Sequence, residues 1–182
     1  MQFLDVAWST RQIISLEFEE RDLDIQANVL SIKQDMLNRG VYHSTMTAQS
    51  FSAFFNAEFQ QRINSIAERS LWALRSEGAS AEADGTAAGH ALFRVLAQEQ
   101  LTRLLTSYDS YIEPVVKPLQ GDHPRQIREQ LVARMANYLR RTDLAVELEY
   151  RASVTAQKEV LALRPTFYGV GIDLKELWKR FF

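Results

Sequence analysis

The sequence predicts an all-α protein, folded as an elongated antiparallel up-down bundle of about four long helices with a short amphipathic helix at its C-terminal end. Two observations lead to this prediction. Apolar residues recur at helical spacing almost throughout, and no segment alternates apolar and polar residues as a half-buried strand does. Only 7 Gly and 4 Pro interrupt the 182 residues, too few for the many turns of an all-β protein.

The first helical segment is expected from about Ser9 to Asn38. Gly40 is expected to end it, because glycine readily adopts the left-handed conformation that closes many helices. The acid-rich stretch from Glu17 to Asp24 leaves open whether this segment is one helix or two. The apolar residues that predict the segment are Ile14, Phe18, Ile25, Val29, Ile32 and Met36.

The second helix is expected to begin at Thr47, whose hydroxyl can cap the free amides, and to end near Glu77. Met46 and Phe51 have the spacing of a hydrophobic staple around such a cap. Phe54 and Trp72 lie off the main apolar stripe and are expected to contact a second neighbour. The stripe itself comprises Phe51, Phe55, Phe59, Ile63, Ile66, Ser70 and Leu74.

Residues 79–89 are almost all small or polar, which predicts a mobile loop before a third helix that carries apolar residues from Leu92 to Ile112. Pro114 and Pro118 are expected to end that helix, and Gly121 follows them. A fourth helix then begins with Asp122 or His123 as its cap and Pro124 in its first turn.

The fourth helix meets no Pro or Gly until Pro165, so it would be about 40 residues and about 60 Å long if unbroken. After Thr142 its apolar residues occupy more than one face. We therefore expect this helix to extend beyond the others or to pack on a second chain. The domain prediction is a bundle over residues 1–163, followed by a turn and a short amphipathic helix over residues 164–182. No internal repeat, and no heptad clean enough for a simple two-stranded coiled coil, is recognised.

Composition and charge exclude several classes of function. The absence of cysteine excludes disulfide frameworks, thiol nucleophiles and the common zinc modules. Lys and Arg number 21 against 23 Asp and Glu, so the net charge of −2 argues against a protein-wide field for nucleic acid. The N-terminal residues carry no basic leader and no segment has the apolar length of a membrane span, so the expected location is the cytoplasm.

No motif identifies a catalytic residue, a metal site or a cofactor. His43, His90 and His123 lack the spacing of helical metal ligands, so structural or solvated roles are expected. Glu17 and Glu20 form a Glu-x-x-Glu that resembles the first acidic pair of magnesium-dependent nucleotide pyrophosphohydrolases, which are helical bundles. The second pair of that family, Glu-x-x-Asp, does not occur between residues 28 and 78. A solvated acidic face is therefore the preferred interpretation.

The arginines of the fourth helix do not form one basic patch. At 100° per residue, Arg125 and Arg140 lie on one flank of the apolar stripe and Arg134 and Arg141 on the other. Such arginines extend along the edges of a buried stripe. Arg128 lies within the margin of the stripe and requires a carboxylate partner, for which the acid-rich first helix is the expected source.

The C-terminal segment carries the strongest signal for a contact surface. Asp173 as N-cap, Glu176 at the third helical position, and the Ile172 and Leu177 staple together predict a short helix. A helix this short requires docking, which leaves three alternatives: its own bundle, a partner or second subunit, and a membrane surface. The residues predicted to bind a partner are Phe167, Tyr168, Leu174, Leu177, Trp178, Phe181 and Phe182.

The functional hypothesis from sequence is a non-enzymatic helical interaction or scaffold module that forms oligomers. It would contact protein partners or its own copies through the fourth helix and the aromatic C-terminal segment. The alternative is a helical-bundle enzyme or small-molecule-binding protein whose pocket lies between helices. That alternative predicts polar residues that point inward and converge on one cavity.

Overall fold

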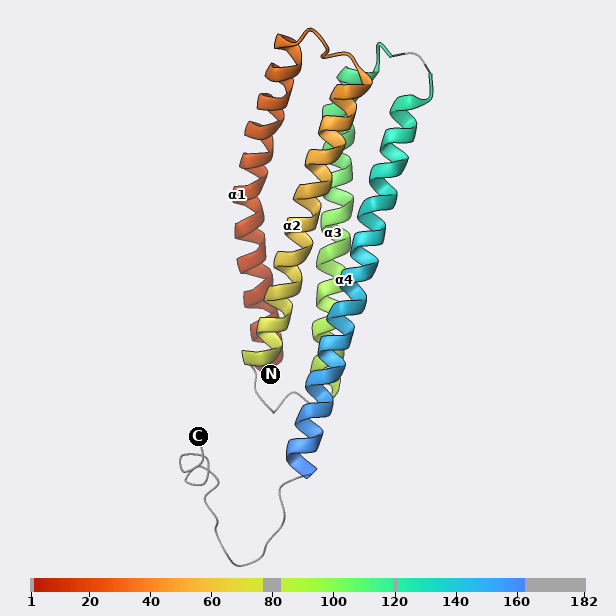
Figure 1. The fold of residues 1–182 in the computed structure, drawn as a ribbon. Helices are drawn as coiled ribbons and strands as arrows, with labels where there is room; N and C mark the ends of the chain where they lie inside the picture. Colours follow the sequence, from red (N-terminus) through yellow and green to blue (C-terminus); the bar gives the residue numbers. More distant parts are fainter. Residues whose placement is uncertain (1, 77–82, 120, 163–182) are drawn as a thin grey trace, which may run out of the picture.

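The computed structural model describes residues 2–76, 83–119 and 121–162. These residues form four helices and no strand: α1 (Gln2–Asn38), α2 (Thr45–Ser76), α3 (Ala83–Val116) and α4 (His123–Ala162). Consecutive helices run antiparallel and lie side by side along their lengths (Figure 1). The predicted all-α up-down bundle is confirmed, while the predicted C-terminal helix lies outside the described residues.

The two middle helices form the centre of the bundle. α2 packs on α3 over the largest contact of the molecule, and α4 packs against both of them. α1 packs mainly on α2 and touches α3 over a smaller area, so α1 is an edge helix. The C-terminal end of α4 extends beyond the ends of the other three helices, as the sequence predicts (Figure 1).

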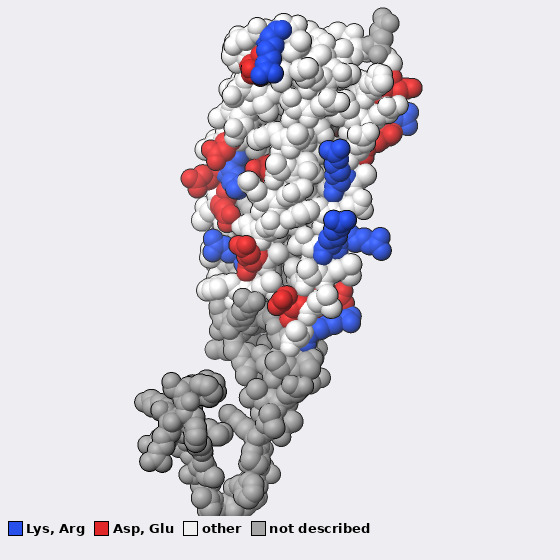
Figure 2. Space-filling model, in the orientation of Figure 1, with Lys and Arg blue, Asp and Glu red and all other residues white. Residues whose placement is uncertain are grey.

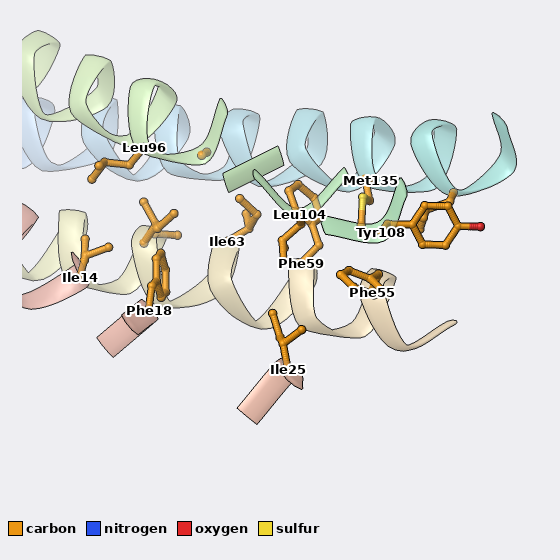
Figure 3. Close-up of a cluster of buried hydrophobic side chains, with 14 of the residues drawn as sticks. Ile14, Phe18, Ile25, Phe55, Phe59, Ile63, Leu96, Leu104, Tyr108 and Met135 are labelled. Carbon is orange, nitrogen blue, oxygen red and sulfur yellow. The ribbon is translucent and has the colours of Figure 1, made fainter. Parts of the chain in front are cut away.

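The core is built from apolar stripes contributed by all four helices (Figure 3). The α2 stripe is confirmed, because its apolar members from Phe51 to Ile66 are fully buried. Phe55 contacts the ring of Tyr108 edge to face at 5.7 Å between centroids, which joins α2 to α3. The buried side chains facing this stripe are Ile14, Phe18, Ile25 and Val29 of α1, Phe93, Leu96, Leu104 and Tyr108 of α3, and Leu131 and Met135 of α4.

The C-terminal end of α1 is closed as predicted. Gly40 has a φ of 70°, the left-handed conformation that glycine adopts without a steric penalty. Its N–H donates to the carbonyl of Leu37 at 2.9 Å, and the N–H of Val41 donates to the carbonyl of Met36 at 3.0 Å. These two bonds define a Schellman motif, which satisfies carbonyls that the helix leaves unpaired.

α1 is one continuous helix through the acid-rich stretch, which settles the question that the sequence leaves open. Two of the five acids of this stretch, Glu17 and Asp22, contact side chains of α2, while Glu19, Glu20 and Asp24 are exposed. Glu17 accepts a hydrogen bond from Ser65 at 2.7 Å, and Asp22 accepts one from Arg62 at 2.7 Å. The expectation of a fully solvated acidic face therefore holds for Glu20, which is exposed, but is wrong for Glu17.

The predicted start of α2 is wrong by one half turn. The cap is Ser44, whose hydroxyl oxygen accepts a hydrogen bond from the N–H of Thr47 at 3.3 Å. Thr47 lies inside the helix and its hydroxyl donates to the carbonyl of Val41 at 2.8 Å. The predicted staple does not form, since half of the surface of Met46 is exposed. Ser44 takes the capping position rather than Thr47 because it is closer to the Gly40 turn and directly precedes Thr45, the first residue of α2.

α3 is longer at both ends than the sequence predicts. It begins at Ala83, so most of the predicted loop over 79–89 is helical. Alanine has the highest helix propensity, which offsets the polar and glycine residues nearby. α3 also passes through Pro114 and ends at Val116. Proline removes one amide donor, and because Pro114 lies two residues before the end of α3, less than one turn of helix follows it.

Gly89 of α3 lies directly against the ring of Tyr150 on α4. A Cβ at Gly89 would lie 2.7 Å from the Tyr150 hydroxyl and 3.0 Å from two ring carbons. Tyr150 cannot move away cheaply, because it is buried and its hydroxyl donates to the carbonyl of Ser70 at 3.1 Å. Glycine at this position lets α2, α3 and α4 share one contact.

We predict that Gly89→Ala destabilises the protein by about 1–3 kcal/mol through overpacking. Replacing a glycine inside a helix by alanine otherwise stabilises it by about 1 kcal/mol, so the sign itself is diagnostic. Urea unfolding measures the change. The double variant Gly89→Ala/Tyr150→Phe should show a smaller cost for the alanine, because the closest atom is removed. A stabilising Gly89→Ala would contradict the close approach.

Candidate functional site

The most unusual group in the interior is Arg62, a fully buried arginine in the middle of α2. Its guanidinium donates to Glu58 at 2.8 Å, to Gln100 at 2.8 Å and to Asp22 at 2.7 Å. It also lies 4.9 Å from the centroid of the Phe18 ring. Arg62 therefore links α1, α2 and α3 from the core.

A second layer of arginines completes this cluster. Arg21 of α1 forms a bidentate pair with Glu58, at 2.9 and 2.7 Å, and also contacts Gln61. Arg103 of α3 pairs with Asp22 from the solvent side. We call the six residues the ion cluster: Arg21, Asp22, Glu58, Arg62, Gln100 and Arg103. Three arginines and two carboxylates leave it one net positive charge, which falls at the half-exposed Arg103.

The electrostatics of the ion cluster favour its charged state. Burial alone would raise the pKa of Glu58, but the hydrogen bonds from Arg21 and Arg62 outweigh burial and lower it. The hydrogen bond to Glu58 in turn raises the pKa of Arg21 above its ordinary value. The arginines and carboxylates of the cluster are thus paired with one another, an arrangement typical of a structural cluster rather than of a reactive one.

A smaller polar cluster joins α3 to α4. Asp143 accepts a hydrogen bond from His90 at 2.7 Å and a bidentate pair from Arg94 at 2.9 and 3.0 Å. Burial would raise the pKa of Asp143, but these hydrogen bonds lower it. His90 thus joins α3 to α4 through this hydrogen bond. His43 lies 3.3 Å from the carbonyl of Val115, and His123 is exposed at the start of α4.

Arg128 has a carboxylate partner, but from a different helix than the sequence predicts. It forms a bidentate pair with Asp109 of α3, at 2.6 and 2.7 Å. The first helix cannot supply the partner, because α1 packs mainly on α2 whereas Arg128 lies on α4 beside α3. Among the described residues, no group of acidic and histidine side chains has the arrangement of a metal site.

A groove of about 1010 Å³ lies over the outer side of α3, between α3 and α4. Its apolar floor includes Leu101 and Leu139, and Arg94, Arg103 and Arg140 stand around it. The first two arginines already pair with Asp143 and Asp22. The groove is open to solvent and separate from the core, so the buried polar residues do not converge on it.

The outward side of α1 carries a row of leucines seven residues apart. Leu16, Leu23 and Leu30 are each about two-thirds exposed, and Leu37 is 54% exposed. At 100° per residue this row lies roughly opposite the stripe that α1 buries in the core. We call Leu16, Leu23, Leu30 and Leu37 the leucine face. Only the buried stripe of α1 is predicted from the sequence. The leucine face has the same seven-residue spacing on the other side of the helix, and this spacing is the signal that could have revealed it.

α4 also presents apolar residues on two sides, as predicted. Val146 and Tyr150 are buried, whereas Leu144 and Leu148 are more than half exposed. The seven C-terminal residues that the sequence predicts to bind a partner, from Phe167 to Phe182, lie outside the described residues. The structure therefore does not test that part of the prediction.

Comparison with known proteins finds no matching family model, no similar curated protein and no similar solved structure. Within residues 2–76, 83–119 and 121–162, none of the helices combines the length and the apolar composition of a transmembrane span. On the face shown in Figure 2, basic and acidic side chains lie in small separate groups between wide uncharged areas.

We predict that Arg62→Ala destabilises the protein by about 3–5 kcal/mol, because it leaves the carboxylates of Glu58 and Asp22 without their buried partner. Urea unfolding at neutral pH measures the loss. Arg125→Ala is the matched control, since its pair with Glu129 lies on the surface of α4, and it should change stability by less than about 0.5 kcal/mol. Equal stability of the two variants would contradict a structural role for the cluster.

The ion cluster also predicts a specific sensitivity to acid. Because the folded pKa of Glu58 is below its unfolded value, its contribution is complete at neutral pH and is lost as pH falls through about 4 and below. We compare urea midpoints across that range for the wild-type protein and Glu58→Gln. The variant should be less stable at neutral pH and should lose less stability in acid. Parallel pH profiles would show that Glu58 contributes nothing to acid unfolding.

Proposed function

We propose that the chain is a non-enzymatic helical interaction module that associates with its own copies or with protein partners. The observation that carries the proposal is the leucine face of α1. Single exposed leucines are ordinary on protein surfaces. A row of four on one side of an edge helix is different, because exposed apolar side chains then recur along one surface, with polar residues such as Glu20 and Gln34 between them.

Two further features support the proposal. Leu144 and Leu148 give the protruding half of α4 a second, smaller apolar surface. The aromatic C-terminal segment, with Trp178 and Phe181 at its centre, would add a third contact as the sequence predicts. The proposal places the module in the cytoplasm and gives it no cofactor, metal or nucleic-acid ligand. A membrane surface remains the lesser alternative for the C-terminal segment.

The groove beside α3 favours a second candidate function, the binding of a small amphipathic anion. Arg140 borders the groove and forms no ion pair among the described residues, and Leu101 and Leu139 give the groove apolar walls. The carboxylates of Glu99 and Asp143 also border the groove, but they pair with Arg11 and Arg94. A thermal-shift screen with nucleotides and metal ions tests this alternative. A stabilisation that Arg140→Ala abolishes would support it, and an unchanged melting temperature with every ligand would oppose it.

Sedimentation of the intact protein over a range of micromolar concentrations tests the proposed function, and a concentration-dependent oligomer is expected. The C-terminal segment is tested in parallel by Trp178→Ala, with Lys179→Ala as the control on the opposite side of the predicted helix. If Trp178 docks on its own chain, its loss should cost about 3–5 kcal/mol at every concentration. If it docks on another subunit, the loss appears as dissociation and depends on concentration.

These measurements have clear negative outcomes. A strict monomer that binds no protein would contradict the proposed function. A Trp178→Ala variant as stable and as associated as Lys179→Ala would remove the C-terminal segment from the set of contacts in the isolated protein.

A further inference from the structure

We propose that the leucine face of α1 pairs antiparallel with the leucine face of a second copy of this chain, which gives a twofold-symmetric dimer. This inference rests on the proposed interaction function and specifies its partner. The occupant of the face is a second copy, and the dimer axis passes at the level of residue 25 of α1.

The seven-residue spacing is the first argument. A strict seven-residue apolar repeat on a helix drifts by about 20° per repeat, and two such helices keep contact by winding around each other. α1 has this repeat on its exposed side, while its core stripe packs on α2 and α3. A second copy carries the same spacing over the same length, about 36 Å from Ile13 to Leu37. The face is therefore complementary to itself, as a twofold interface requires.

The register follows from assigning the leucines to position d of the heptad. Position a is then occupied by Ile13, Glu20, Ala27 and Gln34. In an antiparallel pair, a-residues of one helix lie against d-residues of the other. When the twofold axis passes at residue 25, each of the four leucines packs against one residue at position a of the second copy. The layers are Ile13 on Leu37, Leu16 on Gln34, Glu20 on Leu30, and Leu23 on Ala27 of the second copy.

Charge complementarity decides the direction. Glu19 borders the first half of the face and Lys33 the second half, while Glu20 lies inside the seam at position a. The Lys33 ammonium lies 5.3 Å from the centroid of the Tyr111 ring on α3 of its own chain, so it turns away from that ring to reach a second copy. Antiparallel pairing places Glu19 beside Lys33 of the second copy at both ends of the dimer, which is favourable. Two contacts of the antiparallel pair are unfavourable: each Glu20 faces Leu30 of the second copy inside the seam, and the two copies of Asp24, which are exposed in the single chain, meet at the axis.

A parallel pair is less favourable with the same residues. It places Glu20 against Glu20 inside the seam, and it places Glu19 beside Asp24 of the second copy on both sides. Like charges at such positions are destabilising. The acidic and basic halves of α1 thus match only when the two helices run in opposite directions.

The first test compares two matched charge variants by sedimentation. Leu23→Glu/Leu30→Glu disrupts the leucine face, and Leu144→Glu/Leu148→Glu introduces the same charges at similarly exposed leucines of α4. The α1 variant should weaken dimerisation by at least about 100-fold, because four apolar side chains per dimer are lost. It should keep the melting temperature of the monomer, since these side chains are exposed in the single chain. The α4 variant should dimerise like the wild-type protein, because the proposed pairing uses α1 alone and leaves the apolar surface of α4 for other partners.

The second test fixes the direction of pairing. The chain has no cysteine, so single cysteines can be introduced without interference. Leu16→Cys and Gln34→Cys form one layer of the antiparallel dimer. We expect a disulfide-linked dimer under mild oxidation only when the two variants are mixed, and little when either is oxidised alone. A parallel dimer gives the reverse result, because each cysteine then faces its own copy.

Each outcome supports or overturns the inference. Loss of the dimer in the α1 variant, together with cross-linking of the mixture alone, supports it. A dimer that survives in the α1 variant but dissociates in the α4 variant overturns it and leaves the proposed interaction function standing. Efficient self-cross-linking of Leu16→Cys overturns the antiparallel direction. A wild-type protein that stays monomeric overturns the dimer, and self-association is then excluded from the proposed function as well.

Discussion

The buried guanidinium of Arg62 is the constraint on which the position of α1 depends. A charged group without solvent is stable only if several partners surround it, and its partners come from α1, α2 and α3. The buried stripe of α1 mixes side chains of different shape, such as Phe18 and Val29, and a shift by one turn would also separate the charged pairs. The bidentate contacts of Arg21 and the donors of Arg62 do not tolerate such a shift. The ion cluster therefore fixes the register of the edge helix against the centre of the bundle.

This attachment determines which side of α1 remains outside. Phe18 and Ile25 enter the core, while Arg21 and Asp22 point to partners on α2 and α3. The opposite side is then held toward solvent, and it carries the four exposed leucines together with charged residues such as Glu19 and Glu20. The contacts that hold one side of α1 rigidly also keep its other side in a fixed geometry. Such preorganisation lowers the entropic cost of association.

Much of the fold could be predicted from the sequence, because helix periodicity and terminating residues are local signals. The α2 stripe and the Gly40 end follow from them directly. The start of α2 could not be located reliably, since Ser44 and Thr47 both have capping hydroxyls and the turn geometry chooses between them. The partner of Arg128 depended on which helices are neighbours, which no local pattern specifies. The ion cluster did leave a signal: Glu58 and Arg62 stand four residues apart within the arc of the Phe59 stripe.

The ion cluster also bears on the choice between the two functional hypotheses. A bundle enzyme requires polar residues that converge inward, and this bundle has them. Catalytic groups, however, need unsatisfied hydrogen-bonding capacity or a pKa moved toward neutrality. Here the pKa of Glu58 moves away from neutrality, and its two oxygens are taken by arginines. The ion cluster therefore links helices to one another, and the proposed contacts with other molecules lie on the exposed surface, among them the leucine face of α1.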